Sequence, residues 1–310
     1  VPDVTVLDSA IAPLKPSVNT APRIMTFAVL GGLAAALALA LLLDNVDQRI
    51  RYPDQATHDL GLTIAATVPR FPKGGVTKQS PEQISQLVES FRTLRMNIVN
   101  ASGGAVTMAV SSPSPADGKS FISSNLAMSF ADAGFRTLLV DGDTRRGTLH
   151  EMFGISRSAG LTDYLAKDVE QDAIVHQTAH ENLSVIPSGN PRRRSPELLT
   201  SPALSHLITD LKTRYDAVIF DTPPLAAGID GYAIAAATGS LLVVLRIGQT
   251  EKRMAAAKML LVDRLPINIL GAVLNAAPTG GEYEYYGYVS GYGTLELEPG
   301  QQVAQVAQVS

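Results

Sequence analysis

The chain has 310 residues, of which 45% are hydrophobic and 17% are charged, with a formal net charge of −4. It is long enough to bury one sizeable core, and without a basic surplus to neutralise phosphates its composition argues against a general nucleic-acid binder. Cysteine is absent, which excludes a disulfide framework and a cysteine-type zinc site.

The N-terminal part combines an irregular stretch with a long apolar one. Residues 1–23 contain four prolines and little periodicity, whereas residues 24–43 contain no charged side chain. An apolar run of about 20 residues crosses roughly 30 Å of hydrocarbon. The sequence therefore predicts one transmembrane helix. A signal peptide is disfavoured because a basic n-region and a small-residue cleavage site are both missing.

A polar linker over residues 44–80 leads to an amphipathic segment over residues 81–100. Apolar side chains in the second segment fall on one face at 100° per residue, which predicts a helix. Glu89 and Arg92 project from the far face and Arg95 lies at its border. By themselves these charges are a solvated pair at i,i+3 spacing, worth a few tenths of a kcal/mol.

A Gly-Lys-Ser sequence, Gly118 to Ser120, follows the apolar run 106–110 and precedes a helical pattern. This order suits a phosphate group. Backbone N–H groups at the helix N-terminus face the anion, Lys119 reaches the terminal phosphates, and the Ser120 hydroxyl can bind Mg²⁺. The usual motif begins with a glycine where this chain has Pro113. A lone Gly-Lys-Ser also occurs by chance before ordinary helices.

Two later apolar runs end in aspartate. The first carries Asp141 and Asp143, and the second ends at Asp221. Ligands of open α/β sheets bind beyond the carboxyl ends of the strands, so these carboxylates should converge with Lys119 and Ser120. Two carboxylates and a hydroxyl suit Mg²⁺, which takes few protein ligands and keeps waters. The joint pattern predicts an ATP site with Mg²⁺ at Ser120, Asp143 and Asp221.

The remaining patterns alternate between strands and helices. Strands are predicted near residues 62–68, 136–141, 183–187, 217–221, 241–248 and 269–275, helices near 121–134, 201–214 and 251–265, and mixed helical structure over 147–180. This alternation predicts an α/β fold with a doubly wound, mainly parallel sheet of the P-loop NTPase type, preceded by one transmembrane helix.

Two groups of arginines and the C-terminal tyrosines leave alternatives open. Arg145 and Arg146 could clamp phosphate or pair with carboxylates. The run 192–194 is interpreted as solvated, with contact to anionic lipid or substrate as the alternative. Five of the nine tyrosines lie between Tyr283 and Tyr292, in a segment too rich in glycine and glutamate to form a core. Its plain interpretation is a low-complexity tail.

The three motifs together resemble those of the bacterial tyrosine kinases of the polysaccharide co-polymerase, or chain-length determinant, type. These are P-loop ATPases related to the partition and site-determining ATPases. Their P-x-x-G-K-[ST] loop is matched by residues 115–120, their D-x-D-x-R motif by residues 141–145 and their D-[ST]-P-P motif by residues 221–224. The likeness continues through the LHEMFG, GLTDYL and PELL segments.

The resemblance implies roles for individual residues. Asp141 would be the catalytic base for the tyrosine proton, Lys119 would be catalytic on the β- and γ-phosphates, and Asn275, at the end of its strand, would contact adenine. The nucleotide would bind Pro115, Ala116, Asp117, Gly118, Lys119, Ser120, Phe121 and Asn275. Subunit contact in the family uses an E-x-x-R-x-x-R motif, matched by Glu89, Arg92 and Arg95. The phosphoacceptors would be Tyr283, Tyr285, Tyr286, Tyr288 and Tyr292.

The resulting prediction is a membrane-anchored protein-tyrosine autokinase that regulates polymerisation and export of surface polysaccharide. Its domains would be an extracytoplasmic lead-in (1–23), the span (24–43), a linker (44–80), an ATP-binding kinase domain (81–280) and the tyrosine-rich tail (281–310). Basic residues flanking the span are balanced, so orientation follows from ATP and Mg²⁺, which are cytoplasmic. The catalytic domain would then lie on the cytoplasmic side of a bacterial inner membrane.

The resemblance also implies partners. These are further copies of the chain in a ring, a periplasmic co-polymerase part that is missing or separate, the polysaccharide export machinery and a tyrosine phosphatase, but no nucleic acid. The first residue is Val1 rather than Met, so we expect a fragment or a processed product. The alternative function is a membrane-tethered P-loop ATPase dimerisation switch without kinase activity. Such switches carry an additional lysine early in the phosphate loop, and residues 111–116 contain none.

Overall fold

The computed structural model describes residues 20–70 and 80–278, without the side chains of residues 43–46. Its contacts divide the chain into two units, Val1–Gln48 and Arg49–Ser310. The five tyrosines predicted as phosphoacceptors lie outside the described residues.

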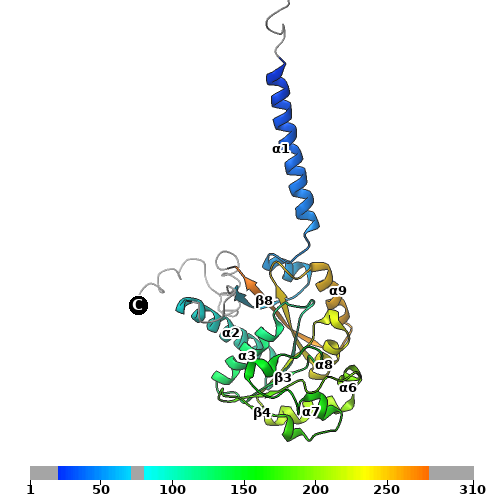
Figure 1. The fold of residues 1–310 in the computed structure, drawn as a ribbon. Helices are drawn as coiled ribbons and strands as arrows, with labels where there is room; N and C mark the ends of the chain where they lie inside the picture. Colours follow the sequence, from blue (N-terminus) through cyan, green and yellow to red (C-terminus); the bar gives the residue numbers. More distant parts are fainter. Residues whose placement is uncertain (1–19, 71–79, 279–310) are drawn as a thin grey trace, which may run out of the picture. The chain divides into compact units, whose positions relative to one another are not determined.

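The described part of the first unit is helix α1, Ala21–Val46, which has 26 residues (Figure 1). Its stretch Ala21–Leu42 has a mean hydropathy of 2.3, and none of that stretch is buried. A helix of this length and composition can cross a membrane. The predicted span over residues 24–43 thus lies within one continuous helix.

The second unit is built on a sheet whose described strands follow the order β1-β8-β7-β2-β6-β3-β5-β4. Neighbouring strands are parallel, except for the antiparallel pair β4 and β5. Central strands of such sheets are covered on both faces, which explains their continuous apolar runs. The strands are β1 Ile64–Pro69, β2 Val106–Ser111, β3 Thr137–Asp141, β4 His176–Gln177, β5 Leu183–Ile186, β6 Ala217–Asp221, β7 Ser240–Arg246 and β8 Asn268–Ala277.

Helices cover both faces of this sheet (Figure 1). One apolar cluster packs α2 and α3 on the sheet, and the other packs α7, α8 and α9 on the opposite face. The fold is therefore the predicted doubly wound, mainly parallel α/β type. The helices are α2 Pro81–Ser102, α3 Lys119–Asp132, α4 Leu149–Phe153, α5 Leu161–Leu165, α6 Ser195–Leu199, α7 Pro202–Arg214, α8 Asp230–Thr238 and α9 Lys252–Val262. Shorter helical turns are η1 Gln55–Asp59, η3 Gln171–Ile174 and η4 Leu225–Ala227.

Local sequence signals determine where helix α2 begins and ends. Ser80 caps its N-terminus and forms a capping box with Gln83, which satisfies backbone N–H groups that have no partner within the helix. Gly103 ends the helix in the left-handed conformation, with φ 63°. The helix buries Phe91, Leu94 and Ile98 against the sheet, as its apolar periodicity predicts.

Two sequence predictions near the sheet edge have different outcomes. The strand near residues 62–68 is confirmed as β1, which pairs in parallel with β8, so this part of the predicted linker segment adds a strand to the second unit. The prediction that Asn275 ends its strand is wrong. Strand β8 continues to Ala277, because Ala277 still pairs with Pro69 of β1.

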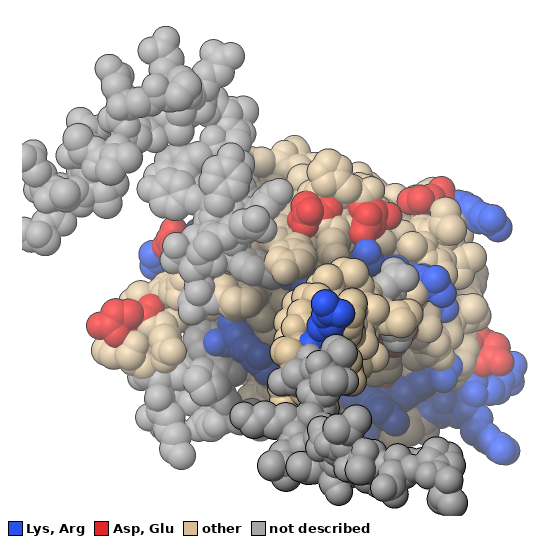
Figure 2. Space-filling model, turned by 90° about the horizontal axis from the view of Figure 1, so that it is seen from above, with Lys and Arg blue, Asp and Glu red and all other residues tan. Residues whose placement is uncertain are grey.

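Charged side chains are mixed on the surface of the molecule. Acidic and basic side chains are interspersed on the face seen from above (Figure 2). This distribution agrees with the formal net charge of −4.

Candidate active site

The phosphate-binding loop connects the central strand β2 to helix α3. The loop turns through two left-handed residues, Ala116 at φ 65° and Gly118 at φ 95°. A Cβ atom on Gly118 would lie 2.1 Å from Nδ2 of Asn275. Glycine is therefore needed at position 118 both for its backbone conformation and for the close approach of the Asn275 side chain.

Asp117 anchors this loop from inside the fold. Its buried carboxylate accepts hydrogen bonds from Thr250 Oγ1 at 2.9 Å and from the Ser114 backbone N–H at 3.1 Å. Burial raises the pKa of Asp117 to about 6, and these hydrogen bonds oppose the rise. The backbone carbonyl of Asp117 accepts from Asn275 Nδ2 at 2.8 Å. These contacts hold the loop in place before any ligand binds.

The structure places Asn275 behind the loop rather than in an open crevice. Its side chain is 7% exposed, and its Oδ1 accepts a hydrogen bond from the backbone N–H of Ala276 at 2.8 Å. Both ends of the amide are thus engaged within the protein. Contact with adenine stays a prediction.

Two side chains at and just after the end of strand β7 support the loop, and neither was predicted from the sequence. Arg246 Nη1 donates to the Ala116 carbonyl at 2.8 Å, and Gln249 Nε2 donates to the Pro115 carbonyl at 3.4 Å. The available signal was their position. Strand β7 lies next to β2, so polar residues at or just after its carboxyl end lie at the same edge of the sheet as the loop.

The two aspartates that end β3 and β6 lie side by side. Asp141 and Asp221 are direct partners in the parallel register, and Asp221 also faces Val110 of β2. Their side chains are buried, at 0% and 2% exposure. Burial raises the pKa of Asp221 to about 6, while the nearby Ser120 hydroxyl and Lys119 ammonium oppose the rise. Burial and then the charge of Asp221 raise the pKa of Asp141 well above its usual value.

Asp143 orders the loop that follows β3. Its carboxylate accepts from the backbone N–H groups of Arg145 at 3.3 Å and Arg146 at 2.9 Å. Its own backbone N–H donates to Asp141 Oδ1 at 3.2 Å, and the Leu149 N–H donates to Asp141 Oδ2 at 3.3 Å. The loop therefore folds around the two carboxylates and gives Asp143 a more exposed position than Asp141.

The structure gives carboxylate partners to one arginine of each group, Arg145 and Arg192. Arg145 Nε pairs with Asp230 Oδ2 at 3.1 Å, and the Asp230 side chain is only 2% exposed, so Arg145 pairs with a carboxylate. Arg192 pairs with Asp163 at 3.2 Å and also with Asp168. The prediction of a solvated run is therefore wrong for Arg192, because this loop packs against the buried Asp163.

The residues at the strand ends fit Mg²⁺. Asp221 Oδ1 is buried and has no hydrogen-bond partner among the described residues, as expected for an oxygen that binds a cation. The Ser120 hydroxyl lies close enough to lower the Asp221 pKa. No group of three or more His, Cys, Asp or Glu side chains in the described ranges could hold a metal alone. Mg²⁺ is usually held by one or two carboxylates together with water and phosphate oxygens.

The three residues predicted for subunit contact lie on α2 in different environments. Arg92 and Glu89 form a long ion pair of 3.6 Å, and their side chains are 60% and 69% exposed. Arg95 instead turns toward α3, where its Nη1 donates to the Ser129 carbonyl and to Ser129 Oγ at 3.0 Å. Glu89 and Arg92 are therefore available to a neighbour, whereas Arg95 connects two helices.

Comparison with known proteins identifies the family. A family model described as an AAA domain matches residues 107–256. The tyrosine-protein kinase YwqD of Bacillus subtilis is 32% identical over 222 residues, which cover 70% of this chain and 93% of YwqD. The chain belongs to the bacterial tyrosine-protein kinase family. The kinase domain of the Escherichia coli tyrosine kinase ETK superposes with a TM-score of 0.67 and 26% identity, over 73% of this chain and 96% of that domain.

The longer relatives of this family extend beyond the present chain. The tyrosine-protein kinase ptk of Acinetobacter johnsonii is 31% identical over 288 residues, which cover 88% of this chain but 39% of ptk. The chain thus spans about two fifths of the length of that relative. The predicted membership in the tyrosine kinase family and the P-loop ATPase fold are both confirmed.

Proposed function

We propose that this chain is the membrane-anchored catalytic part of a protein-tyrosine autokinase. It transfers the γ-phosphate of ATP to the C-terminal tyrosine cluster of a neighbouring subunit. The observation that supports this most is the pair of buried carboxylates, Asp141 and Asp221, beside the phosphate loop in a chain whose relatives are named tyrosine-protein kinases. Strands β3 and β6 end in the two carboxylates, and helix α3 begins with Lys119, so charged groups suited to phosphoryl transfer come from neighbouring elements.

The phosphate loop and its neighbours bind and orient ATP. Backbone N–H groups at the start of α3 face the phosphates, and Lys119 reaches the β- and γ-phosphates. Ser120 and Asp221 hold Mg²⁺, with Asp143 binding it directly or through water. When bound, Mg²⁺ neutralises phosphate charge, and the prepositioned loop limits reorganisation during the transfer.

Asp141 accepts the proton of the attacking tyrosine hydroxyl. A tyrosine has a pKa near 10 and is protonated at pH 7, so a positioned acceptor helps the reaction. The Asp141 carboxylate is held in position for this by the backbone N–H groups of Asp143 and Leu149. This carboxylate lies beside that of Asp221, within the group of residues assigned to Mg²⁺.

The setting of the reaction follows from helix α1 and the family. The apolar helix anchors the chain in the bacterial inner membrane, with the kinase domain and tail in the cytoplasm, where ATP and Mg²⁺ are available. Copies assemble into a ring through α2, act with a periplasmic co-polymerase part and the export machinery, and are reset by a tyrosine phosphatase. The cycle regulates the polymerisation and export of surface polysaccharide.

A direct phosphorylation experiment tests this proposal. The purified chain in detergent is incubated with ATP and Mg²⁺, and phosphotyrosine is located by mass spectrometry. We expect phosphate on the tyrosines between 283 and 292, and none in Asp141→Asn, which should still bind nucleotide. ATP hydrolysis without any phosphotyrosine would instead support the dimerisation switch.

The tail also provides a way to control assembly. Each phosphate adds about −1.5 to −2 charges, so several of them repel one another and the site carboxylates. We therefore expect phosphorylation to expel the tail and loosen the ring. Replacing all five tail tyrosines by Phe should give a chain that stays assembled with ATP. The mass of the assembly in detergent is measured before and after ATP is added. If the parent and the Phe variant dissociate equally, phosphorylation of the tail does not control assembly.

A further inference from the structure

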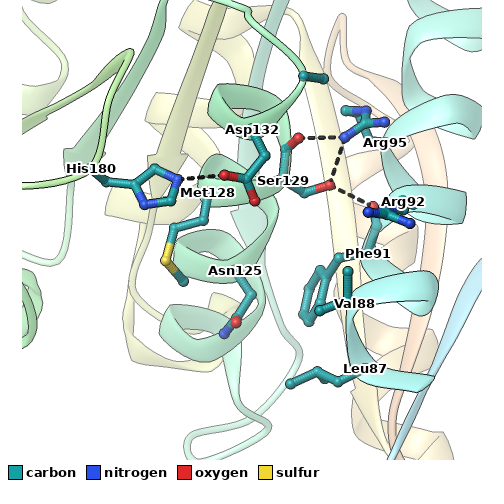
Figure 3. A pocket seen from close by; sticks show the side chains of 11 residues that line it. Leu87, Val88, Phe91, Arg92, Arg95, Asn125, Met128, Ser129, Asp132 and His180 are labelled. Carbon is teal, nitrogen blue, oxygen red and sulfur yellow. Dashed lines mark hydrogen bonds and ion pairs between the residues drawn. The ribbon is translucent and has the colours of Figure 1, made fainter. Parts of the chain in front are cut away.

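A pocket of about 370 Å³ lies between helices α2 and α3, on the face of the fold that carries the predicted subunit contact (Figure 3). Its lining is mixed: polar and charged side chains from both helices surround four larger apolar ones, Leu87, Val88, Phe91 and Met128, which we name the apolar floor. Phe91 is 3% exposed, whereas Val88 is 42% exposed and open to a ligand. A hollow that combines apolar side chains with polar groups that can fix a ligand's orientation is the usual character of a binding site.

Positive charge gathers at one side of this rim. Ser129 holds Arg95 in place through Nη1, and Arg92 has a long ion pair with the exposed Glu89. Desolvation and then the charge of Arg92 lower the pKa of Arg95, while the charges of Asp132 and Glu89 oppose this. The acidic Asp132 on the same rim is engaged by His180 at 2.8 Å (Figure 3). An anion between the two arginines would be stabilised.

The chain itself contains a segment of matching chemistry. Residues 279–310 include four glutamates and no lysine, arginine or aspartate, and five tyrosines lie between Tyr283 and Tyr292. This segment follows strand β8, which packs against helix α2. At roughly 3.3 Å per extended residue, Tyr283 can reach about 20 Å from Ala277 and Tyr292 about 50 Å. Helix α2, which lines the pocket, has 22 residues and is therefore about 33 Å long, so the reach of the segment is comparable with the length of that helix.

We propose that the pocket between α2 and α3 binds a phosphorylated tyrosine of the C-terminal segment. The aromatic ring packs on the apolar floor, and the phosphate lies between Arg92 and Arg95. Guanidinium groups bind phosphate through charge-assisted, often bidentate hydrogen bonds. The inference rests on the proposed function in one respect, because the kinase reaction supplies the phosphate.

This assignment gives the two arginines a second role. In the unphosphorylated chain Arg92 is available for contact between subunits. Once a phosphotyrosine occupies the pocket, Arg92 is engaged and the surface of α2 is covered. Binding of the phosphorylated tail in the pocket then competes with contact between subunits through α2. Tail phosphorylation would in this way loosen the ring without the help of another protein.

Peptide binding tests the assignment independently of catalysis. The probe is a fluorescent synthetic peptide of residues 281–293, prepared with all five tyrosines phosphorylated, with none, or with glutamate in their place. The protein is the full chain in detergent with its five tail tyrosines replaced by Phe. We expect fluorescence anisotropy to show at least tenfold tighter binding of the phosphopeptide than of the other two. Arg92→Ala and Val88→Glu should each weaken it at least tenfold.

A matched control and a competitor define the site. Arg193→Ala removes an exposed arginine from another loop and should leave the affinity unchanged, as should saturating ATP and Mg²⁺. Equal affinity for all three peptides would overturn the proposal in favour of simple attraction to an acidic segment. Displacement by ATP, or binding unaffected by both Arg92→Ala and Val88→Glu, would overturn it as well. Since the peptides are synthetic, a chain without kinase activity gives the same answer.

Discussion

The nucleotide site and the face between α2 and α3 use charge in opposite ways. At the nucleotide site, Asp141 and Asp221 are buried side by side, and the nearby loop is held by Asp117. On the α2–α3 face, Glu89 and Arg92 are mostly exposed and meet at 3.6 Å. Charges of the first kind dominate stability and chemistry, whereas exposed pairs contribute little to either.

This difference indicates which region can change partners. Buried carboxylates that face each other destabilise the fold unless a cation lies between them, so the nucleotide site is built for one ligand. Arg92 is exposed and costs little to rearrange, so its side chain can serve subunit contact in one state and bind a phosphate in another. The following experiments test this contrast, beginning with the largest expected effect.

Removing the cation of the phosphate loop should have the largest effect. Lys119→Met leaves an apolar side chain of similar length and should reduce phosphotyrosine formation by roughly 10²- to 10³-fold, the loss expected when one transition-state charge partner is removed. Lys212→Met, on the exposed side of α7, is the matched control. Undiminished labelling of Lys119→Met would contradict the assignment of the ATP site.

Asp117 should make stability depend on pH. Its pKa is raised from 3.8 to about 6 in the folded state, so the native protein holds the proton more tightly than the unfolded chain. The stability that protonated Asp117 provides is present below pH 3.8 and is lost as pH rises through about 6, by about 3 kcal/mol. The isosteric Asp117→Asn should not show this loss.

Urea unfolding from pH 4 to 7.5 measures the free energy of unfolding of both proteins. Since the other titrating groups are common to the two chains, the difference between them isolates Asp117. A difference that is constant across this pH range would show that Asp117 keeps an ordinary pKa.

The α2 arginines should affect assembly more than nucleotide binding. Arg92→Ala combined with Arg95→Ala removes the two cations predicted for subunit contact and should weaken self-association by about tenfold or more, at about 1.4 kcal/mol per factor of ten. Trans-phosphorylation should fall with it, while ATP affinity is retained. Analytical ultracentrifugation in detergent and nucleotide titration check the two expectations. If the variant self-associates and forms phosphotyrosine as the parent does, these arginines are merely solvated charges with no role in subunit contact.

The smallest effect is expected at Glu89. Glu89→Ala removes an exposed i,i+3 ion pair and should lower the free energy of unfolding by less than about 0.5 kcal/mol. Chemical denaturation at low and at 1 M salt measures this, because screening should abolish the difference between variant and parent. A loss of 2 kcal/mol would mean that this face is as tightly coupled to the fold as the nucleotide site.

The sequence predicted the parts of the site that depend on local order along the chain. Asp141 and Asp221 end predicted strands, and Lys119 and Ser120 follow another. Because parallel strands align their carboxyl ends, this local order is enough to place all four residues at the same edge of the sheet. Arg246, Gln249 and Thr250 were not predicted as supports of the loop. Their contacts join residues more than 100 positions apart, and such pairings depend on strand order, which periodicity does not specify.

By itself, the sequence determined the apolar helix, the alternation of strands and helices, the three motifs and their likeness to the tyrosine kinases. Each of these follows from side-chain periodicity or from residues close together in the chain. Tertiary structure alone decided that Arg145 pairs with Asp230, that Asn275 supports the phosphate loop, and that Arg95 turns toward α3. A side chain with several hydrogen-bonding groups takes the partner that packing brings within reach, and packing is a property of the whole fold.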